Sequence, residues 1–182
     1  MKIIETAIPD VKIIEPRVFS DDRGYFLETW NAQGFNQAGL SSSFVQDNQS
    51  KSRRNVLRGL HYQIQSPQGK LVRVVTGAVY DVAVDLRRTS PTFGRWVGVE
   101  LSEDNHRMVW VPIGFAHGFL TLRDNTQLVY KCTDVYASQH ERAIMWNDPD
   151  LAIAWPLAAG EEPIVSPKDA VGRSLKEADL FA

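Results

Sequence analysis

Two histidines stand in sequence settings that point to chemistry. One lies in Arg58-Gly59-Leu60-His61-Tyr62-Gln63 and the other in Pro112-Ile113-Gly114-Phe115-Ala116-His117-Gly118-Phe119, and the chain holds four histidines in all. An imidazole buried in a strand needs polar partners, so each ring alone is equally explained as a satisfied core residue. Two such rings in one short chain favour a shared cavity, where imidazole exchanges protons near neutral pH.

The two histidines fall short of a metal site. Pro112-x-Gly114-x-x-His117 resembles the second sequence motif of the cupin superfamily, whose metal-binding members carry His-x-His and a following Glu in the first motif. Here that place reads His61-Tyr62-Gln63, and no acidic residue follows before Asp81. A catalytic zinc or non-haem iron needs about three protein ligands. We expect no metal and no cofactor, with Gln63 or a distant acid as the only route to a complete ligand set.

Three other residues suit acid–base chemistry without a metal. Lys70 leads the run Leu71 to Val75, where a fixed cation could stabilise an oxyanion, but an exposed lysine at a strand start has the same pattern. Tyr130 lies in mid-strand and is equally explained as a packed core tyrosine. Asp169 is equally explained by a helix start, where a carboxylate interacts with the helix dipole. None of the three identifies a function alone.

The pattern that must position these residues is β-structure. Period-two and β-branched runs from about residue 44 to 155 predict an all-β sandwich or barrel. The runs Leu71 to Val75 and Ala78 to Leu86, joined by Thr76-Gly77, predict a hairpin with a short glycine turn. The further predicted strands are 96–101, 107–111, 118–122 and 127–133.

Predicted helices are few and short. Asn31 caps a predicted helix to about Ala38, with Gly39 just past its end. Ser166-Pro167-Lys168-Asp169 has the cap, first-turn proline and acidic third position of a helix start, and a second short helix is predicted from Leu175 to Phe181. The sequence has no repeat, low-complexity tract or linker, so residues 1–182 are expected to form one domain.

Bulk properties exclude several classes of protein. A chain of 182 residues is long enough to bury a core. The net charge of −2 gives no sign of nucleic-acid or membrane binding. No apolar run is long enough to cross a bilayer or to act as a signal peptide. The single Cys132 is expected to be a small buried residue, and we expect a soluble cytoplasmic protein.

Read together, these motifs resemble the dTDP-4-dehydrorhamnose 3,5-epimerase family, a metal-free branch of the cupins. The resemblance implies a cupin-like jelly-roll barrel (double-stranded β-helix) with a few short peripheral helices. It also implies a place in dTDP-L-rhamnose biosynthesis and so in cell-surface polysaccharide formation. The segments that carry it are 22–28, 45–50, 57–63, 69–73, 81–87, 114–119, 130–131, 136, 141–142, 146–149 and 166–169.

The resemblance assigns a role to each candidate residue. His61 would be the general base that removes the proton next to the C4 ketone of the sugar, and Asp169 would orient its ring. Lys70, with His117, would stabilise the enolate oxygen. Tyr130 would return a proton from the opposite face, because inversion needs an acid and a base on opposite sides of the carbon.

The resemblance also implies how a dTDP-sugar is held. Arg23 and Arg58 would grip the pyrophosphate, and Tyr136 would stack on the thymine ring. The remaining implied contacts are Phe26, Glu28, Gln46, Asp47, Asn48, Lys70, His117, Glu141 and Lys168.

Family members are homodimers, and the resemblance extends this expectation to the ends of the chain. Residues 1–16 would exchange strands with the partner's sheet, because an uncovered β-edge tends to find a partner. Residues 160–182 would pack near the site.

Three alternatives remain open at this point. A related sugar enzyme could invert a single centre or move the ketone, although Tyr130 argues for inversion. A metal-dependent cupin oxygenase or isomerase would require bound iron, nickel or zinc. A non-catalytic nucleotide-sugar-binding module would keep its function after His61→Ala or Tyr130→Phe.

Overall fold

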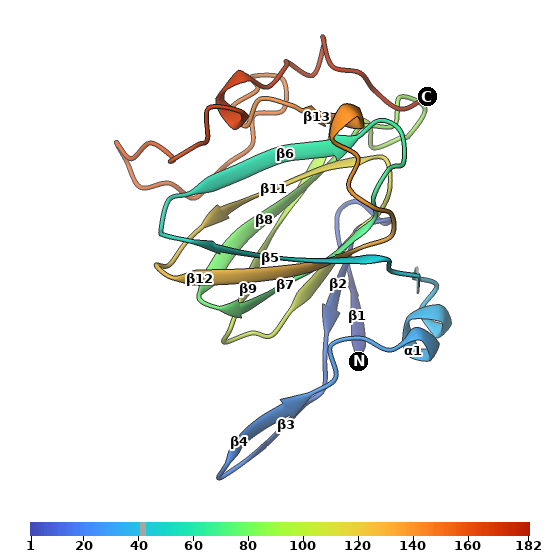
Figure 1. Ribbon diagram of the computed structural model, residues 1–182, viewed down its shortest axis with the longest axis vertical. Coiled ribbons are helices and arrows are strands. Elements are labelled where there is room, and N and C mark those ends of the chain that lie inside the picture. The colour runs from blue at the N-terminus through green and yellow to red at the C-terminus, as the bar shows by residue number, and fades with distance from the viewer. Residues whose placement is uncertain (41–42) are drawn as a thin grey trace.

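The structure, a computed structural model, describes residues 1–40 and 43–182 and is almost entirely β (Figure 1). Two antiparallel sheets face each other and form a barrel, which confirms the prediction of a cupin-like all-β fold. The first sheet has the order β1-β2-β10-β7-β12-β5, with bounds β1 Lys2–Glu5, β2 Lys12–Glu15, β5 Gln46–Ser52, β7 Lys70–Thr76, β10 Met108–Val111 and β12 Thr126–Cys132. The second has the order β13-β6-β11-β8-β9, with bounds β6 Leu57–Gln63, β8 Ala78–Asp85, β9 Trp96–Ser102, β11 Phe115–Thr121 and β13 Glu141–Ala143.

Strand alternation divides each sheet into an inner and an outer face. On β7, Val72 and Val74 belong to the core between the sheets, whereas Leu71 packs in a separate cluster with α1 (Ala32–Gln37) on the outside. On β6, Leu60 and Tyr62 pack outward. Because successive strand residues point to opposite faces, His61 points into the barrel.

The C-terminal segment covers the outer face of the second sheet. Its apolar residues Leu151, Trp155 and Phe181 pack in one cluster with Leu60 and Tyr62, and the segment runs across the top of Figure 1 in orange and red. Backbone bridges between residues 56 and 164 and between residues 144 and 173 fasten it to the barrel. These contacts place the C-terminal part of the chain beside β6, the strand that carries His61.

The hairpin predicted around Thr76-Gly77 is wrong. β7 pairs with β10 and β12, whereas β8 pairs with β9 and β11 in the other sheet. Gly77, with φ of +82°, carries the chain from one sheet to the other instead of folding it back. Both strands have an apolar inner face, so they stabilise the fold by packing across the core and not by pairing edge to edge.

The helix predictions have mixed outcomes. The helix capped by Asn31 is confirmed, because the Asn31 side chain accepts a hydrogen bond from the Gly34 amide at 2.6 Å. Ser166 does accept a hydrogen bond from the Asp169 amide, but only the short 3-10 turn η2 (Asp169–Val171) follows. The helix predicted from Leu175 to Phe181 is wrong. There the amides of Leu175 and Phe181 bond to Asp148 and Leu86 instead, which draws the segment onto the sheet.

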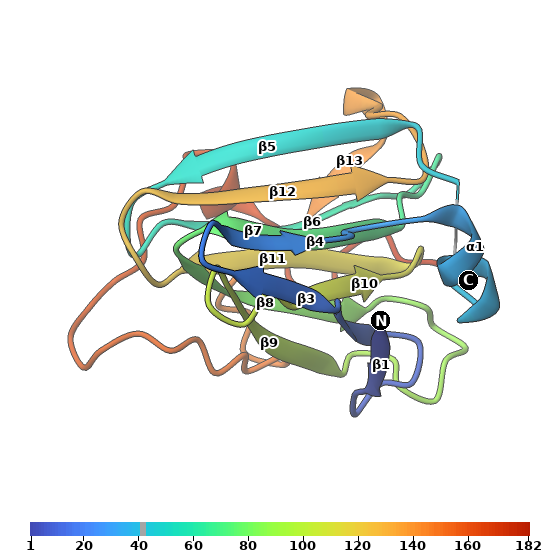
Figure 2. The same ribbon diagram turned by 90° about the horizontal axis from the view of Figure 1, so that it is seen from below.

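The N-terminal strands and a projecting hairpin occupy the other end of the molecule. β1 pairs with β2, and β2 pairs with β10 of the same chain. The hairpin of β3 (Val18–Asp21) and β4 (Gly24–Leu27) projects away from the barrel in Figure 1 and lies in front of it in Figure 2. The short 3-10 turn η1 (Ser138–His140) precedes β13. No helix in residues 1–40 and 43–182 has the length and apolar character to cross a membrane.

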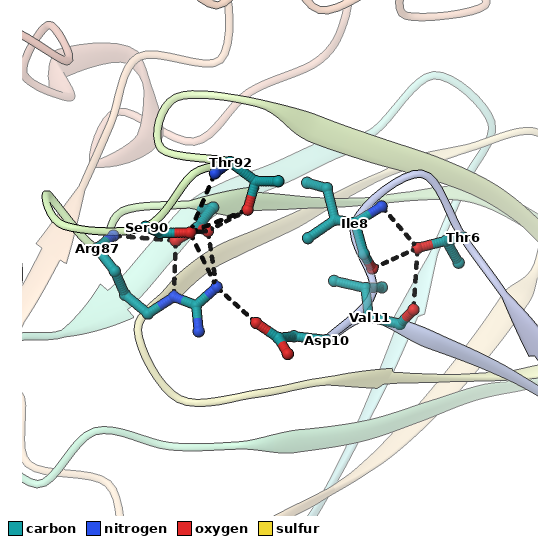
Figure 3. Close-up of polar contacts among 8 residues, drawn as sticks. Thr6, Ile8, Asp10, Val11, Arg87, Ser90 and Thr92 are labelled. Atoms are coloured by element: carbon teal, nitrogen blue, oxygen red, sulfur yellow. Dashed lines mark hydrogen bonds and ion pairs between the residues drawn. The ribbon is translucent and has the colours of Figure 1, made fainter.

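A buried carboxylate fixes the β8–β9 loop. Asp85 is fully buried and accepts hydrogen bonds from Arg87, Ser90 and Thr92 at 2.6–3.0 Å. Arg87 also bonds to Asp10, so the network reaches the turn between β1 and β2 (Figure 3). Burial alone raises the pKa of Asp85, but these hydrogen bonds outweigh it and lower the pKa to about 2.

Asp85→Asn is expected to lower the free energy of unfolding at pH 7 by about 2–3 kcal/mol, because a pKa shift of one unit corresponds to about 1.4 kcal/mol. The folded pKa lies below the unfolded one, so this stabilisation is present above about pH 4 and is lost as the pH falls toward 2. Urea denaturation at several pH values measures it. Equal acid sensitivity in the wild type and the variant would contradict this assignment.

Candidate active site

A cavity of about 450 Å³ opens between the two sheets at one end of the barrel. His61 on β6 and His117 on β11 line it from the second sheet, and Lys70 on β7 and Tyr130 on β12 line it from the first. The volume is in the range of small-molecule sites. The cavity therefore joins four of the predicted residues, with the imidazoles on one wall and the phenol on the other.

His61 forms a pair with a carboxylate that is distant in the sequence. Its Nε2 lies 2.6 Å from Oδ1 of Asp169, which η2 carries and which is buried. Burial raises the pKa of Asp169, but the His61 contact, together with hydrogen bonds from Ser166 and Gly59, outweighs it, and the net shift is downward. An ionised carboxylate at Nε2 fixes the ring with its proton there and leaves Nδ1 as the basic nitrogen.

His117 forms a second pair of the same kind. It lies opposite His61 in the strand register, and its Nε2 is 2.8 and 3.0 Å from the two carboxylate oxygens of Asp81. Both side chains are buried. Sequence reasoning did not identify Asp81 as a site residue. The available signal was that two acids, Asp81 and Asp85, interrupt the apolar run Ala78 to Leu86, because a buried charge needs a partner.

Lys70 and Tyr130 are neighbours on adjacent strands of the first sheet. The Lys70 Nζ lies 6.0 Å from the centre of the Tyr130 ring. Burial lowers the pKa of Lys70, and electrostatic interactions with Cys132, Asp81 and Glu141 oppose that shift. Burial raises the pKa of Tyr130, while the nearby Arg58 guanidinium acts in the other direction. The phenol is thus a protonated donor at neutral pH.

A cluster of three polar side chains joins Tyr136, Glu141 and the cavity-lining Lys168. Glu141 accepts hydrogen bonds from the Tyr136 hydroxyl and the Lys168 ammonium group. Burial raises the pKa of Glu141, but its two partners outweigh this and lower it. The Tyr136 ring is exposed, so one of its faces is available for stacking beside the cavity.

The residues predicted on β5 divide between the two faces of the sheet. Asn48 lies opposite Tyr130 in the register, and Gln46 accepts a hydrogen bond from the Tyr136 amide at 2.8 Å. Asp47 instead forms an ion pair with Lys131 at 3.0 Å. Because Lys131 follows Tyr130 directly, this pair lies on the outer face of the sheet, away from the two imidazoles.

Two further predicted or considered residues on β6, Gln63 and Arg58, have different positions relative to the cavity. Gln63 is buried, accepts a hydrogen bond from the Ala137 amide and donates one to the Ser66 carbonyl. It therefore anchors the loop that carries Tyr136 and does not line the cavity. Arg58 donates from Nε to the Ser52 hydroxyl at 3.2 Å, an arrangement that directs the rest of its guanidinium toward the cavity that it lines.

The structure does not bring Arg23, Phe26 or Glu28 to the cavity of the same chain. Arg23 pairs with Asp21 at 2.6 Å at the tip of the hairpin, Phe26 is 70% exposed, and Glu28 bonds to Asn31. The projecting hairpin lies well away from β6 in Figure 1. Within one chain, these three residues form no part of the site.

A metal site is not assembled from the side chains that the structure describes. In residues 1–40 and 43–182, no three His, Cys, Asp or Glu side chains are grouped as metal ligands. Each cavity histidine instead uses Nε2 for its own carboxylate. A metal-free reaction stays a prediction, which activity after chelator treatment would test.

Comparisons with known proteins agree with this geometry. A model of the family described as dTDP-4-dehydrorhamnose 3,5-epimerase matches residues 5–177. The dTDP-4-dehydrorhamnose 3,5-epimerase of Pseudomonas aeruginosa is 57% identical over 182 residues, which cover 100% of this chain and 99% of that protein.

Solved structures share the fold. The dTDP-6-deoxy-D-glucose-3,5-epimerase of Legionella pneumophila, in complex with dTDP-4-keto-L-rhamnose, superposes with a TM-score of 0.94 at 52% identity and covers 98% of this chain and 94% of that one. A 3'-monoepimerase from Streptomyces bikiniensis, in complex with dTDP-quinovose, has a TM-score of 0.88 at 38% identity and covers 94% and 87%. From its site, its fold and these matches, the chain belongs to the dTDP-4-dehydrorhamnose 3,5-epimerase family.

Proposed function

We propose that this chain carries out the reaction of its family, the epimerisation of dTDP-4-dehydro-6-deoxy-D-glucose at C3 and C5 to dTDP-4-dehydro-L-rhamnose. The observation that carries the proposal is the cavity with the His61–Asp169 pair on one wall and Tyr130 on the other. An acid and a base on opposite faces of one carbon are what inversion requires. A cytoplasmic setting forms part of this proposal.

The first step is proton abstraction by His61. Asp169 holds the ring with its proton on Nε2, and the Nδ1 lone pair takes the proton from the carbon next to the C4 ketone. The electrons of the C–H bond form a C=C bond, and the carbonyl π electrons move to oxygen. Lys70 and His117 face the resulting enolate oxygen, where fixed donors in a buried site stabilise developing charge.

The second step is proton return from the opposite face. Tyr130 donates its hydroxyl proton to the carbanionic carbon, which inverts the centre, and solvent restores both groups. The raised pKa of the Tyr130 phenol, caused mainly by burial, keeps this proton in place at neutral pH. The same two groups serve C3 and C5 in turn, because both carbons flank the C4 ketone.

Substrate binding accounts for the remaining predicted residues. The Arg58 guanidinium is placed to grip the pyrophosphate with two parallel hydrogen bonds. Tyr136 would stack on thymine, with its hydroxyl held by Glu141. Gln46 and Asn48 would contact the nucleotide, and Lys168 would reach it from the cavity that it lines. Asp47 would support this region of β5 through its ion pair with Lys131.

Proton exchange in D₂O tests the proposal. Proton NMR of the sugar in the presence of chelator-treated enzyme should show deuterium at both C3 and C5. The likeness to the 3'-monoepimerase favours a second candidate, inversion of a single centre. Deuterium at one carbon only would establish that candidate, and no deuterium at either carbon would overturn both.

We further propose that the chain works as a homodimer whose hairpins cross between subunits. Phe19, Tyr25 and Phe26 on the β3–β4 hairpin are all exposed in the single chain, and exposed apolar clusters mark interaction sites. The β1 edge of the first sheet is open as well. A dimer would cover these surfaces and bring Arg23, Phe26 and Glu28 to the partner's cavity.

A complementation experiment tests the shared site. Arg23→Ala and His61→Asn are each expected to be nearly inactive alone. Co-expressed together, they should recover about a quarter of wild-type activity, because half of the dimers are mixed and each mixed dimer has one intact site. Sites built within one chain predict no recovery. Light scattering on the same samples measures the oligomeric state.

A further inference from the structure

Asp81 is a buried carboxylate that contacts His117, a residue that lines the cavity. It lies on β8, next to β11 in the second sheet, and is 1% exposed. Both of its oxygens lie within hydrogen-bond distance of one atom, Nε2 of His117, at 2.8 and 3.0 Å. A carboxylate that faces a ring nitrogen with both oxygens requires a proton on that nitrogen, because a bare lone pair there would repel it.

The contact with Asp81 limits the hydrogen bonds that the His117 ring can donate in the cavity. With one proton placed on Nε2, a neutral ring presents the lone pair of Nδ1 to the cavity. A lone pair cannot stabilise a negative enolate oxygen. The ring becomes a donor toward the cavity only when both nitrogens carry protons, and the buried carboxylate is then its counter-charge.

The charges around His117 act on that doubly protonated form in both directions. The titratable and charged groups at this cavity are Arg58 and His61 from β6, Lys70 from β7, Tyr130 and Cys132 from β12, Glu141 from β13, and Lys168 and Asp169 from the C-terminal segment. The ammonium group of Lys70 opposes a second positive charge nearby, as do Arg58 and Lys168. Among the residues that the structure describes, Asp81 is the acid that contacts His117, so its charge acts most directly in favour of an imidazolium there.

We infer that Asp81 is a positioning residue that holds His117 as an imidazolium, so that Nδ1–H of His117 donates a hydrogen bond to the developing enolate oxygen. This inference rests on the proposed function. The inference also gives the His61–Asp169 pair and the His117–Asp81 pair different roles in the reaction. His61 begins the cycle neutral and accepts a proton, whereas His117 stays charged throughout and only donates a hydrogen bond.

The experiment combines kinetics with nitrogen NMR on Asp81→Asn. We expect kcat to fall about 100-fold, the low end of the loss seen when one oxyanion donor is removed. KM and dTDP affinity should stay within about threefold, because Asp81 does not touch substrate. In ¹⁵N-histidine spectra at neutral pH, assigned by replacing His61, His106, His117 and His140 singly, both nitrogens of His117 should show imidazolium shifts in the wild type and neutral-ring shifts in the variant.

Asp85→Asn is the matched control. It removes another buried carboxylate from the same strand, and we expect it to lower stability while leaving kcat and the His117 spectrum unchanged. A neutral His117 in the wild-type spectrum would overturn the inference, and that result does not depend on whether Asp81→Asn folds. Unchanged kcat in a folded Asp81→Asn enzyme would overturn it too. Absence of deuterium exchange in the wild type would instead refute the proposed function. The exchange measurement therefore distinguishes failure of the proposed function from failure of the inference about His117.

Discussion

His61→Asn is expected to abolish deuterium exchange at both C3 and C5 and to lower kcat by about 10⁴-fold, the upper range for loss of a general base. Asparagine keeps a polar side chain beside Asp169 but has no basic nitrogen to accept a carbon-bound proton. The enolate then never forms, so exchange and epimerisation disappear together. Proton NMR of the sugar in D₂O measures the exchange, and the conversion of substrate to product measures turnover.

The control for His61→Asn is the loss of an imidazole elsewhere. His106 lies on the β9–β10 loop, contacts the Tyr25 ring at a tilt and has φ of +53°, a conformation that asparagine tolerates. His106→Asn should leave exchange at both carbons intact. Affinity for dTDP should survive in both variants. Residual exchange above about 1% of the wild-type rate in His61→Asn would contradict the assignment of His61 as the base.

The sequence predicted the barrel well because strand periodicity is a local signal. Runs such as Gln127 to Thr133 alternate between the core and the outer face, and the structure has β12 there. The pairing of strands is not local. Thr76-Gly77 has the composition of a hairpin turn, but the neighbours of β7 come from β10 and β12. Only the packing of two apolar faces across the core decides that outcome.

The residues of the site also differ in whether a local sequence signal predicts their position. His61, His117, Lys70 and Tyr130 lie on strands whose alternation can be read from the sequence, and all four line the cavity. Asp169 lies 108 residues from His61, on a segment fastened to the barrel by scattered backbone bridges, so no pattern in the residues alone predicts their contact. The contact between His61 and Asp169 was predicted only from the resemblance to a family.

Asp81 and the hairpin residues show two further limits of sequence reasoning. Asp81 lies in a strand that is largely apolar, and its role depends on which ring lies diagonally across the β8–β11 pair. Arg23 and Phe26 lie on the β3–β4 hairpin, which projects away from the barrel in a single chain. In the proposed dimer their use depends on a second copy, and neither strand periodicity nor the fold of one chain contains that information.

Tyr130→Phe should separate proton removal from inversion. We expect epimerisation to fall about 10³-fold, within the range for loss of a general acid, while deuterium exchange at C3 persists at a rate well above that of turnover. His61 still forms the enolate in this variant, and its captured proton exchanges with solvent. Without the phenol on the opposite wall, deuterium returns from the His61 side and restores the original configuration.

The measurement is the ratio of exchange to epimerisation in D₂O, followed by NMR on one sample. In the wild type each inversion brings in deuterium, so the ratio is near one, whereas in Tyr130→Phe it should rise at least about 10-fold. Tyr80→Phe is the matched control, because Tyr80 packs against Trp155 outside the cavity, and it should leave the ratio unchanged. Equal loss of exchange and epimerisation in Tyr130→Phe would show that the phenol acts before the enolate forms. Tyr130 would then hold the substrate or the ketone oxygen, and the acid that inverts the centre would have to be sought on another wall of the cavity.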